Sequence, residues 1–341
     1  MKTKTLEVKQ IDWFDDHWYK IRYLDDRRIE VEEYFASVTT KLNILAKPHL
    51  IKWYGDIGYS EAKKRTRQAA DRGTRIHYAW YTYVSGGAVI YQNERTPAYD
   101  QDELNEIFKR YNGNVWILEN QDEHWDFLKV VEMFKRLSPD IVEAEKAVYH
   151  IDHREAGTAD NIFNIKEGDY EISGSKPIKL SGGMYMGDLK TGAQVGKEAF
   201  MQISAYVHCA ESMGYDRFQG ALIYHTQGAI RTGIEGLKVY VLTRDEIDAY
   251  YADFRDISRV WERQESGKKP IIRQMPCLVA LNETHKRVEK NKPEEPKQEE
   301  NKTQEKEQCQ VSDKPKSSKE TGKSEKNLPN SVSTDSSSKK S

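Results

Sequence analysis

The stretch "GDLKTGAQVGKEAFMQISAYVHCAESMG" at residues 187–214 decides the fold of this chain. It begins with Asp188 and Lys190, which lie two apart in an extended run and therefore share one face of a strand. The following residues carry Gln202 and Tyr206 four apart, a spacing that places both side chains on one face of a helix. A charged strand end followed directly by such a helix predicts an α/β protein.

Strand-like and helix-like segments alternate along the rest of the chain, up to about residue 265. Alternating or β-branched runs predict strands at 17–24, 27–39, 141–151, 157–165, 182–192, 218–226 and 236–242. Apolar residues at helical spacing predict helices at 60–84, 96–113 and 120–139, one that ends at 214, and one at 243–264. The pattern predicts a mixed central sheet with helices, preceded by a helical region.

Turn and capping residues mark the ends of several predicted segments. The pair Asp25–Asp26 predicts a hairpin turn between the first two strands. Ser60 fits the N-cap of the first long helix, and Thr243 begins the last helix with a capping box to Glu246. Gly214 predicts a glycine C-cap for the helix of the opening stretch.

The composition describes a protein with a highly charged surface. Charged residues make up 32% of the 341 residues and apolar residues 37%, and the net charge is −2. Any nucleic acid would therefore bind through a local basic groove. No apolar run approaches the ~18 residues of a membrane-spanning helix, and the N-terminus has no apolar signal region. Three widely spaced cysteines, Cys209, Cys277 and Cys309, fit neither a disulfide framework nor a CxxC site, so we expect a cytoplasmic location.

The composition changes sharply at residue 286. The segment 286–341 contains no aromatic residue and few apolar ones, so it cannot bury enough surface to offset the loss of chain entropy. We expect a disordered, low-complexity tail there. Such a tail serves either to keep the protein soluble or to bind a partner.

Acidic residues recur at corresponding places in the three middle strands. Glu143 and Glu145 are two apart, Asp160 follows a glycine, and Asp188 precedes Lys190 by two. Neighbouring strands would bring two or three carboxylates and one ammonium group together, and such a cluster suits Mg²⁺ or Mn²⁺. The chemistry that this predicts is metal-assisted phosphodiester hydrolysis. Taken singly, each of these residues also fits a solvated surface charge.

Five short blocks of the chain resemble the PD-(D/E)XK nuclease superfamily, and within it the RecB-type exonuclease domains, including those of phages. The blocks are "GTRIH" (73–77), "EAEKAV" (143–148), "GTADNIF" (157–163), "GDLKTG" (187–192) and "QISAY" (202–206). They follow the order of the family, and the last block, Q-x-x-x-Y, distinguishes the RecB-type branch. The resemblance implies a restriction-endonuclease-like core, in which helices flank a mixed central sheet. It implies a nuclease domain at 1–285, with a catalytic core at about 140–265 and a helical region at about 40–139.

The resemblance also implies roles for single residues. The implied metal ligands are His77, Asp160, Asp188 and the backbone carbonyl of Leu189. Lys190 would orient the hydrolytic water, and Glu145, with Glu143 as the alternative, would be the acid that precedes the core. Many RecB-like relatives bind an iron–sulfur cluster through four cysteines, an arrangement that this chain lacks, so we expect Mg²⁺ or Mn²⁺ and no cluster.

DNA-binding residues are expected at two places. Gln202 and Tyr206 would contact DNA or brace the active strand, as the resemblance implies. The helix that leads to His77 is strongly basic, which suits contact with phosphates. Its predicted DNA-binding residues are Lys63, Lys64, Arg67, Arg72 and Arg75. The alternative interpretation of this basic run is a solvated helix face.

These observations together favour a metal-dependent deoxyribonuclease. The resemblance implies an exonuclease that processes DNA ends in recombination, repair or phage replication, in the cytoplasm of a bacterium or a phage-infected cell. Two alternatives stay open: a structure-specific endonuclease of the same superfamily, and a non-catalytic DNA-binding recombination partner. The expected substrate is linear duplex DNA or single-stranded ends. A recombination protein or single-strand-binding protein is the expected partner of the tail.

Overall fold

The computed structural model describes residues 4–13, 16–93, 99–172, 177–226 and 236–270. The chain divides into two units, Met1–Gln274 and Met275–Ser341, and the second lies outside the described residues. The tail predicted at 286–341 and the domain boundary predicted after residue 285 fall outside them as well. Across the described ranges, no helix is both long and apolar enough to cross a membrane.

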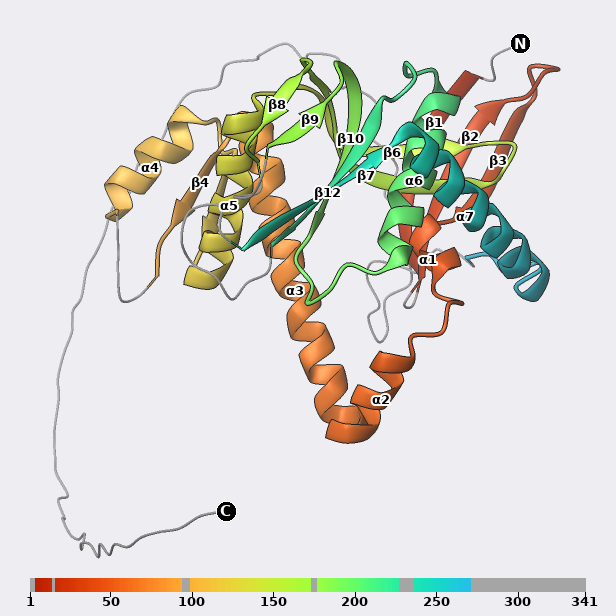
Figure 1. The fold of residues 1–341 in the computed structure, drawn as a ribbon, viewed down its shortest axis with the longest axis horizontal. Coiled ribbons are helices and arrows are strands. Elements are labelled where there is room, and N and C mark those ends of the chain that lie inside the picture. The colour runs from red at the N-terminus through yellow and green to blue at the C-terminus, as the bar shows by residue number, and fades with distance from the viewer. Residues whose placement is uncertain (1–3, 14–15, 94–98, 173–176, 227–235, 271–341) are drawn as a thin grey trace, which may run out of the picture. The chain divides into compact units, whose positions relative to one another are not determined.

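A five-stranded mixed sheet forms the centre of the fold (Figure 1). Its strands are β6 (Asp140–His150), β7 (Glu155–Ile165), β10 (Gly183–Lys190), β11 (Gly220–Thr226) and β12 (Leu237–Thr243). They lie in the order β12-β11-β10-β7-β6, with β10 and β11 parallel and the other neighbours antiparallel. All five correspond to predicted segments, so the predicted mixed α/β fold with a central sheet is confirmed.

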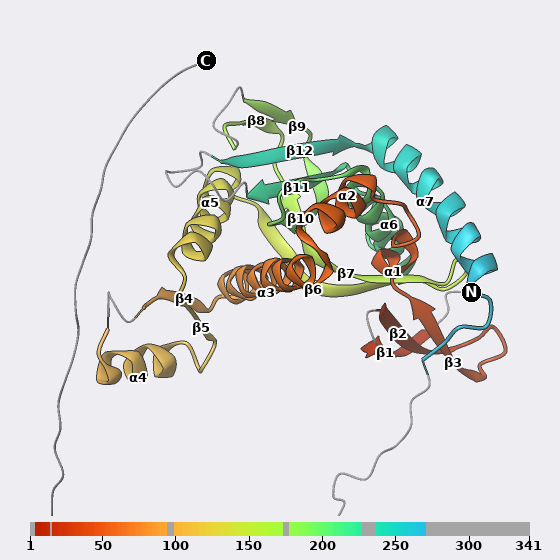
Figure 2. The ribbon, with the colours of Figure 1, turned by 90° about the horizontal axis from the view of Figure 1, so that it is seen from below.

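Helices cover both faces of this sheet (Figure 2). The helices are α1 (Val38–Leu42), α6 (Lys197–Met213) and α7 (Arg244–Gln264) on one face, and α3 (Tyr59–Val84) and α5 (Gln121–Leu137) on the other. Side chains alternate along β10: Met186 belongs to the core with α6, and Tyr185 and Leu189 to the core with α3 and α5. Strand β10 therefore contributes side chains to both cores.

A three-stranded antiparallel sheet precedes the central domain. Its strands are β1 (Lys4–Trp13), β2 (Asp16–Leu24) and β3 (Glu30–Ala36). The predicted hairpin is confirmed, and the Asp25 carboxylate accepts hydrogen bonds from the backbone N–H groups of Arg27 and Ile29. Strand β1 is not predicted from the sequence, because its many charged residues obscure the alternation of apolar and polar residues. Tyr19 joins this sheet to β7 through a 2.7 Å hydrogen bond with Thr158.

Smaller elements complete the described part of the chain. They are α2 (Pro48–Ile57), β4 (Ala88–Tyr91), α4 (Gln101–Arg110), β5 (Val115–Leu118), β8 (Gly168–Tyr170) and β9 (Ile178–Leu180). The prediction of Ser60 as a helix N-cap is wrong, because Gly58 is the N-cap and Ser60 is the second residue of α3. Gly58 has φ +82°, a backbone conformation that glycine adopts without steric cost, and it joins α2 directly to α3. The predicted capping box of Thr243 and the glycine C-cap at Gly214 are confirmed.

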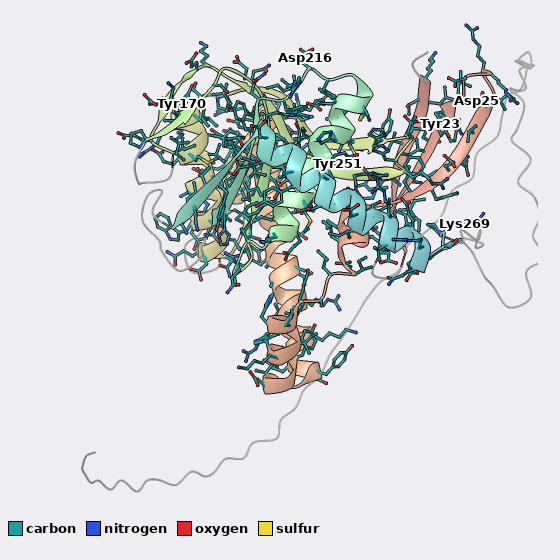
Figure 3. The ribbon with its side chains drawn as sticks, turned by 45° about the vertical axis from the view of Figure 1, so that its right-hand side comes forward. Tyr23, Asp25, Tyr170, Asp216, Tyr251 and Lys269 are labelled. Carbon is teal, nitrogen blue, oxygen red and sulfur yellow. The ribbon has the colours of Figure 1, made fainter. Side chains whose placement is uncertain are left out.

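Three histidines gather around Tyr251 of α7, which is labelled in Figure 3. The rings of His150 and His153 stack 3.9 Å apart, and His153 Nδ1 lies 2.6 Å from the Tyr251 hydroxyl. His208 stacks on the Tyr251 ring at 3.9 Å. Burial, reinforced by the neighbouring charge of His153, lowers the pKa of His150 to about 4. Burial also lowers the pKa of His153 and of His208, so the whole cluster favours neutral imidazoles.

This cluster predicts a loss of stability in mild acid. Because the pKa of His150 is about 4 in the folded protein and near 6.5 when unfolded, the unfolded chain takes up the proton first as the pH falls. The contribution of neutral His150 to the free energy of unfolding is fully present above the unfolded pKa. It falls by roughly 1–2 kcal/mol between pH 7 and pH 5. Urea unfolding at pH 7 and at pH 5 measures this loss. His150→Gln should reduce the pH dependence, and His49→Gln, at an exposed histidine of α2, should leave it unchanged. Equal effects of the two variants would contradict this assignment.

Candidate metal centre

The carboxylates of β7 and β10 meet where these two strands stop pairing. Their backbone ladder ends at the pair of Gly187 with Asn161, one residue before Asp188 and one after Asp160. Beyond this point the backbone N–H of Leu189 donates to Asp160 Oδ2 at 2.7 Å. A carboxylate thus takes the place of a backbone acceptor at the open end of the ladder. The Leu189 backbone, predicted as a carbonyl ligand, contacts Asp160 through its N–H.

The structure distinguishes between Glu143 and Glu145. Glu145 lies opposite Asp160, because the β6–β7 ladder pairs the residues on either side of them. The backbone of Glu145 has φ +48°, a conformation that costs energy in a residue with a side chain. Glu143 instead forms a 2.9 Å ion pair with Lys146 and accepts a hydrogen bond from Tyr215. Of the two predicted acids, Glu145 is therefore the one that reaches Asp160.

His77 of α3 completes a group of three possible metal ligands. His77 Nδ1 lies 3.6 Å from Asp160 Oδ2, and the Asp160 side chain is only 11% exposed. One ligand atom each from His77, Glu145 and Asp160 lies within 4.8 Å of the other two. These three residues are called the acid–histidine group below. Two carboxylates suit a hard divalent cation, and the imidazole is compatible with a first-row metal such as Mn²⁺.

The pKa values of Glu145 and of the neighbouring Asp188 are both raised at the acid–histidine group. Glu145 is exposed as a whole residue, yet partial removal of its carboxyl group from water, followed by repulsion from Asp160 and Asp188, raises its pKa to about 8. Burial is also the largest cause for Asp188, whose pKa rises to about 6 although Lys190 opposes the shift. In both cases burial is the largest cause and repulsion between the carboxylates adds to it, so nearby cations do not fully compensate the ionised forms. A divalent cation would reverse this imbalance, so the residues fit one.

Lys190 connects Asp188 to the following helix. Its ammonium group lies 2.8 Å from Asp188 Oδ2 and donates to Gln202 Oε1 at 2.9 Å. Gln202 Nε2 donates in turn to the Tyr206 hydroxyl at 2.9 Å. The predicted D-x-K and Q-x-x-x-Y blocks thus form one hydrogen-bonded chain. Tyr206 is buried, with 4% exposure, which favours the bracing role over the alternative of DNA contact.

The glycine of the "GTAD" block makes room for this chain. A Cβ atom at Gly157 would lie 2.1 Å from Cε1 of Tyr206, far inside van der Waals contact. The Tyr206 ring can therefore lie flat against β7 only because residue 157 has no side chain. This contact links the third block of the resemblance to the fifth through packing.

A buried polar cluster around Asn161, beside Asp160, is not predicted from the sequence. Asn161 is fully buried, and its Oδ1 accepts hydrogen bonds from Trp80 Nε1, at 2.6 Å, and from the Tyr224 hydroxyl. Trp80 lies three residues after His77 on α3. The cluster therefore fixes α3 against β7 and holds His77 opposite Asp160. A buried amide in an otherwise apolar strand is the signal that points to it.

Arg72 and Arg75, predicted to bind DNA, face α5. Arg72 forms an ion pair with Asp126 and donates to the backbone carbonyl of Thr191 at 3.1 Å. Arg75 donates twice to Glu123, at 2.9 and 2.6 Å. Both acids are buried, Glu123 at 2% and Asp126 at 0% exposure. These ion pairs hold α3 on α5, whereas the other predicted DNA-binding residues of α3 are exposed: Lys63, Lys64 and Arg67.

A matched pair of substitutions on α3 tests this division. Arg75→Met leaves the buried Glu123 carboxylate without its bidentate partner, and we expect the free energy of unfolding to fall by about 1–3 kcal/mol. Arg67→Met, eight residues earlier on the same helix, should change it by less than about 0.5 kcal/mol. Thermal or urea unfolding of both variants is the measurement. A loss of stability as large in Arg67→Met would contradict the division.

No protein-family model matches the chain, and no curated protein matches it. The assignment of a function therefore rests on the geometry of the described residues. It brings together His77, Glu145, Asp160, Asp188, Lys190, Gln202 and Tyr206. Cys209 is a buried free thiol, and Cys277 and Cys309 lie outside the described residues.

Proposed function

We propose that this chain is a metal-dependent deoxyribonuclease with a core of the PD-(D/E)XK type. The observation that carries the proposal is the convergence of the acid–histidine group with the buried Asp188 and its partner Lys190. Clustered carboxylates with an adjacent lysine suit the hydrolysis of phosphodiesters, where negative charge builds up on the phosphate. The order of the motifs along the chain supports the same proposal.

The residues of the site would have different roles in hydrolysis. His77, Glu145 and Asp160 would hold a Mg²⁺ or Mn²⁺ ion with Asp188, and the ion would supply Lewis-acid polarisation of the phosphate. Asp188 and Gln202 fix the ammonium group of Lys190 at 2.8 and 2.9 Å. Lys190 would orient the attacking water and stabilise charge on the phosphate oxygens. Tyr206 would hold Gln202, and through it Lys190, in place.

We propose an exonuclease that acts on DNA ends. End-labelled linear duplex, closed circular duplex and single-stranded DNA, each with Mg²⁺, Mn²⁺ or EDTA, test the proposal. Cleavage of linear substrates with either ion and none with EDTA is the expected result. Cleavage of closed circles would replace the exonuclease by an endonuclease. Absence of cleavage with every substrate and ion would overturn the proposed enzyme and leave a DNA-binding protein.

A further inference from the structure

Helices α2 and α3 form an arm (Figure 1), and His77 lies in the C-terminal third of α3. Helix α2 has no buried residue, and the first seventeen residues of α3 bury only Ala62. From Tyr59 to His77 the helix rises about 27 Å at 1.5 Å per residue. Among the described residues, four of the five buried side chains of α3 belong to its last nine residues, and the rest of the arm extends far beyond the acid–histidine group.

One face of α3 runs in line with His77. Residues three or four positions apart are neighbours on the same side of a helix, so successive steps of three or four residues follow one face. Counting back from His77, this face carries Thr74, Ala70, Arg67, Lys63 and Tyr59, which we call the track face. The side chains at 70 and 74 are small and exposed, so no bulky group separates the two cations from His77. The Thr74 hydroxyl is turned back onto the Ala70 carbonyl at 3.0 Å.

The cations of the track face differ from the two arginines that follow them on α3, Arg72 and Arg75. Within the described part of the chain, neither Lys63 nor Arg67 pairs with an acid, and the Lys63 ammonium lies 6.0 Å over the Tyr59 ring. Away from the track face, Arg72 and Arg75 are held by Asp126 and Glu123. Lys63 and Arg67 thus leave two positive charges without acidic partners on the line that ends at His77, within the described residues.

We propose that the track face binds single-stranded DNA and guides it toward the acid–histidine group. The charge of Lys63 and Arg67 complements a phosphate backbone. Tyr59, with 68% exposure, lies on this face, and Tyr81, with 40%, lies one turn beyond His77. Exposed tyrosine rings stack on bases that are free of a partner strand, as single-stranded DNA offers. The proposal rests on the proposed nuclease function, of which it specifies the substrate.

Fluorescence anisotropy of the full chain with a labelled 20-nucleotide oligothymidylate in EDTA tests the proposal. The double variant Lys63→Ala/Arg67→Ala should bind about tenfold or more weakly, and the slope of log K against log salt should drop by about 1.4, or 0.7 per phosphate contact. The matched control is Lys109→Ala/Arg110→Ala, which removes two exposed charges from α4, away from the track face. We expect it to change the affinity less than about threefold. Circular dichroism checks that both variants fold.

Three results would overturn the track. These are equal losses in the two double variants, unchanged binding in Lys63→Ala/Arg67→Ala, and tighter binding of a 20-base-pair duplex than of the single strand.

Tyr59→Ala should weaken single-strand binding several-fold and Tyr59→Phe should not, since the ring alone stacks. Equal effects of the two variants would remove Tyr59 from the track face. If the wild type cleaves DNA with Mg²⁺ and the track variants bind normally, only the track fails. If the wild type never cleaves and the track variants lose binding, only the proposed nuclease fails.

Discussion

Replacing Asp160 by asparagine is expected to lower metal-dependent DNA cleavage by about 10³-fold or more. Asp160 connects the parts of the site, because it lies 3.6 Å from His77 Nδ1 and accepts the Leu189 N–H at 2.7 Å. Asparagine keeps the size of the side chain and can still accept that hydrogen bond. The loss would therefore arise from charge and metal binding and not from unfolding. Initial rates on end-labelled DNA with Mg²⁺ and Mn²⁺, and calorimetric titration with Mn²⁺, are the measurements.

Two neighbouring glutamates provide the control for this prediction. Glu145→Gln should lower cleavage by about 10²-fold or more, whereas Glu143→Gln should leave cleavage within a few-fold of the wild type. The two residues lie on the same strand, and Glu143 is bound to Lys146 away from the acid–histidine group. If Glu143→Gln were the inactive variant, or if Asp160→Asn kept full activity, the proposed site would be wrong. Neither Gln variant should lower the melting temperature by more than a few degrees.

Replacing Gly157 by alanine is expected to impair stability and activity together. The new Cβ atom would lie 2.1 Å from Tyr206 Cε1, so the Tyr206 ring must move out of its position against β7. Overpacking of a rigid core costs about 1–3 kcal/mol. Because Tyr206 holds Gln202, and Gln202 holds Lys190, the displacement should also reach the proposed catalytic lysine. Urea unfolding and cleavage rates of the same preparation measure the two effects.

A second glycine and a second substitution isolate the cause. Gly55→Ala, on the exposed helix α2, adds a methyl group with no atom within 4 Å and should be neutral or slightly stabilising. Gly157→Ala combined with Tyr206→Leu should recover part of the lost stability, because the clash is removed, but not the activity. Full activity in Gly157→Ala would show that the chain from Tyr206 to Lys190 has no part in cleavage.

Local sequence patterns determined most of the regular structure. The five central strands, the long helices, the capping box at Thr243 and the glycine C-cap at Gly214 follow from periodicity and from residue preferences. These signals act over a few residues, so they can be read without knowing the fold. The same holds for the acids at the strand ends, whose spacing already indicated that Asp188 and Lys190 would share a face.

Other features depended on contacts between residues far apart in the chain. The register of β6 on β7 shifts between Ile141 and Glu143, which changes the faces of the following side chains and sets Glu145 opposite Asp160. No count along the sequence reveals such a shift. The pairing of Arg75 with a buried acid of α5 is equally non-local, and it separates arginines that are alike in sequence.

The sequence by itself therefore determined which residue types are available for chemistry and on which element each one lies. Only the tertiary structure decided which acids meet, which cations stay open and why residue 157 has no side chain. The physical reason is that strand register, ion pairing and close packing are settled between elements. Their energies depend on distances that local propensity does not specify.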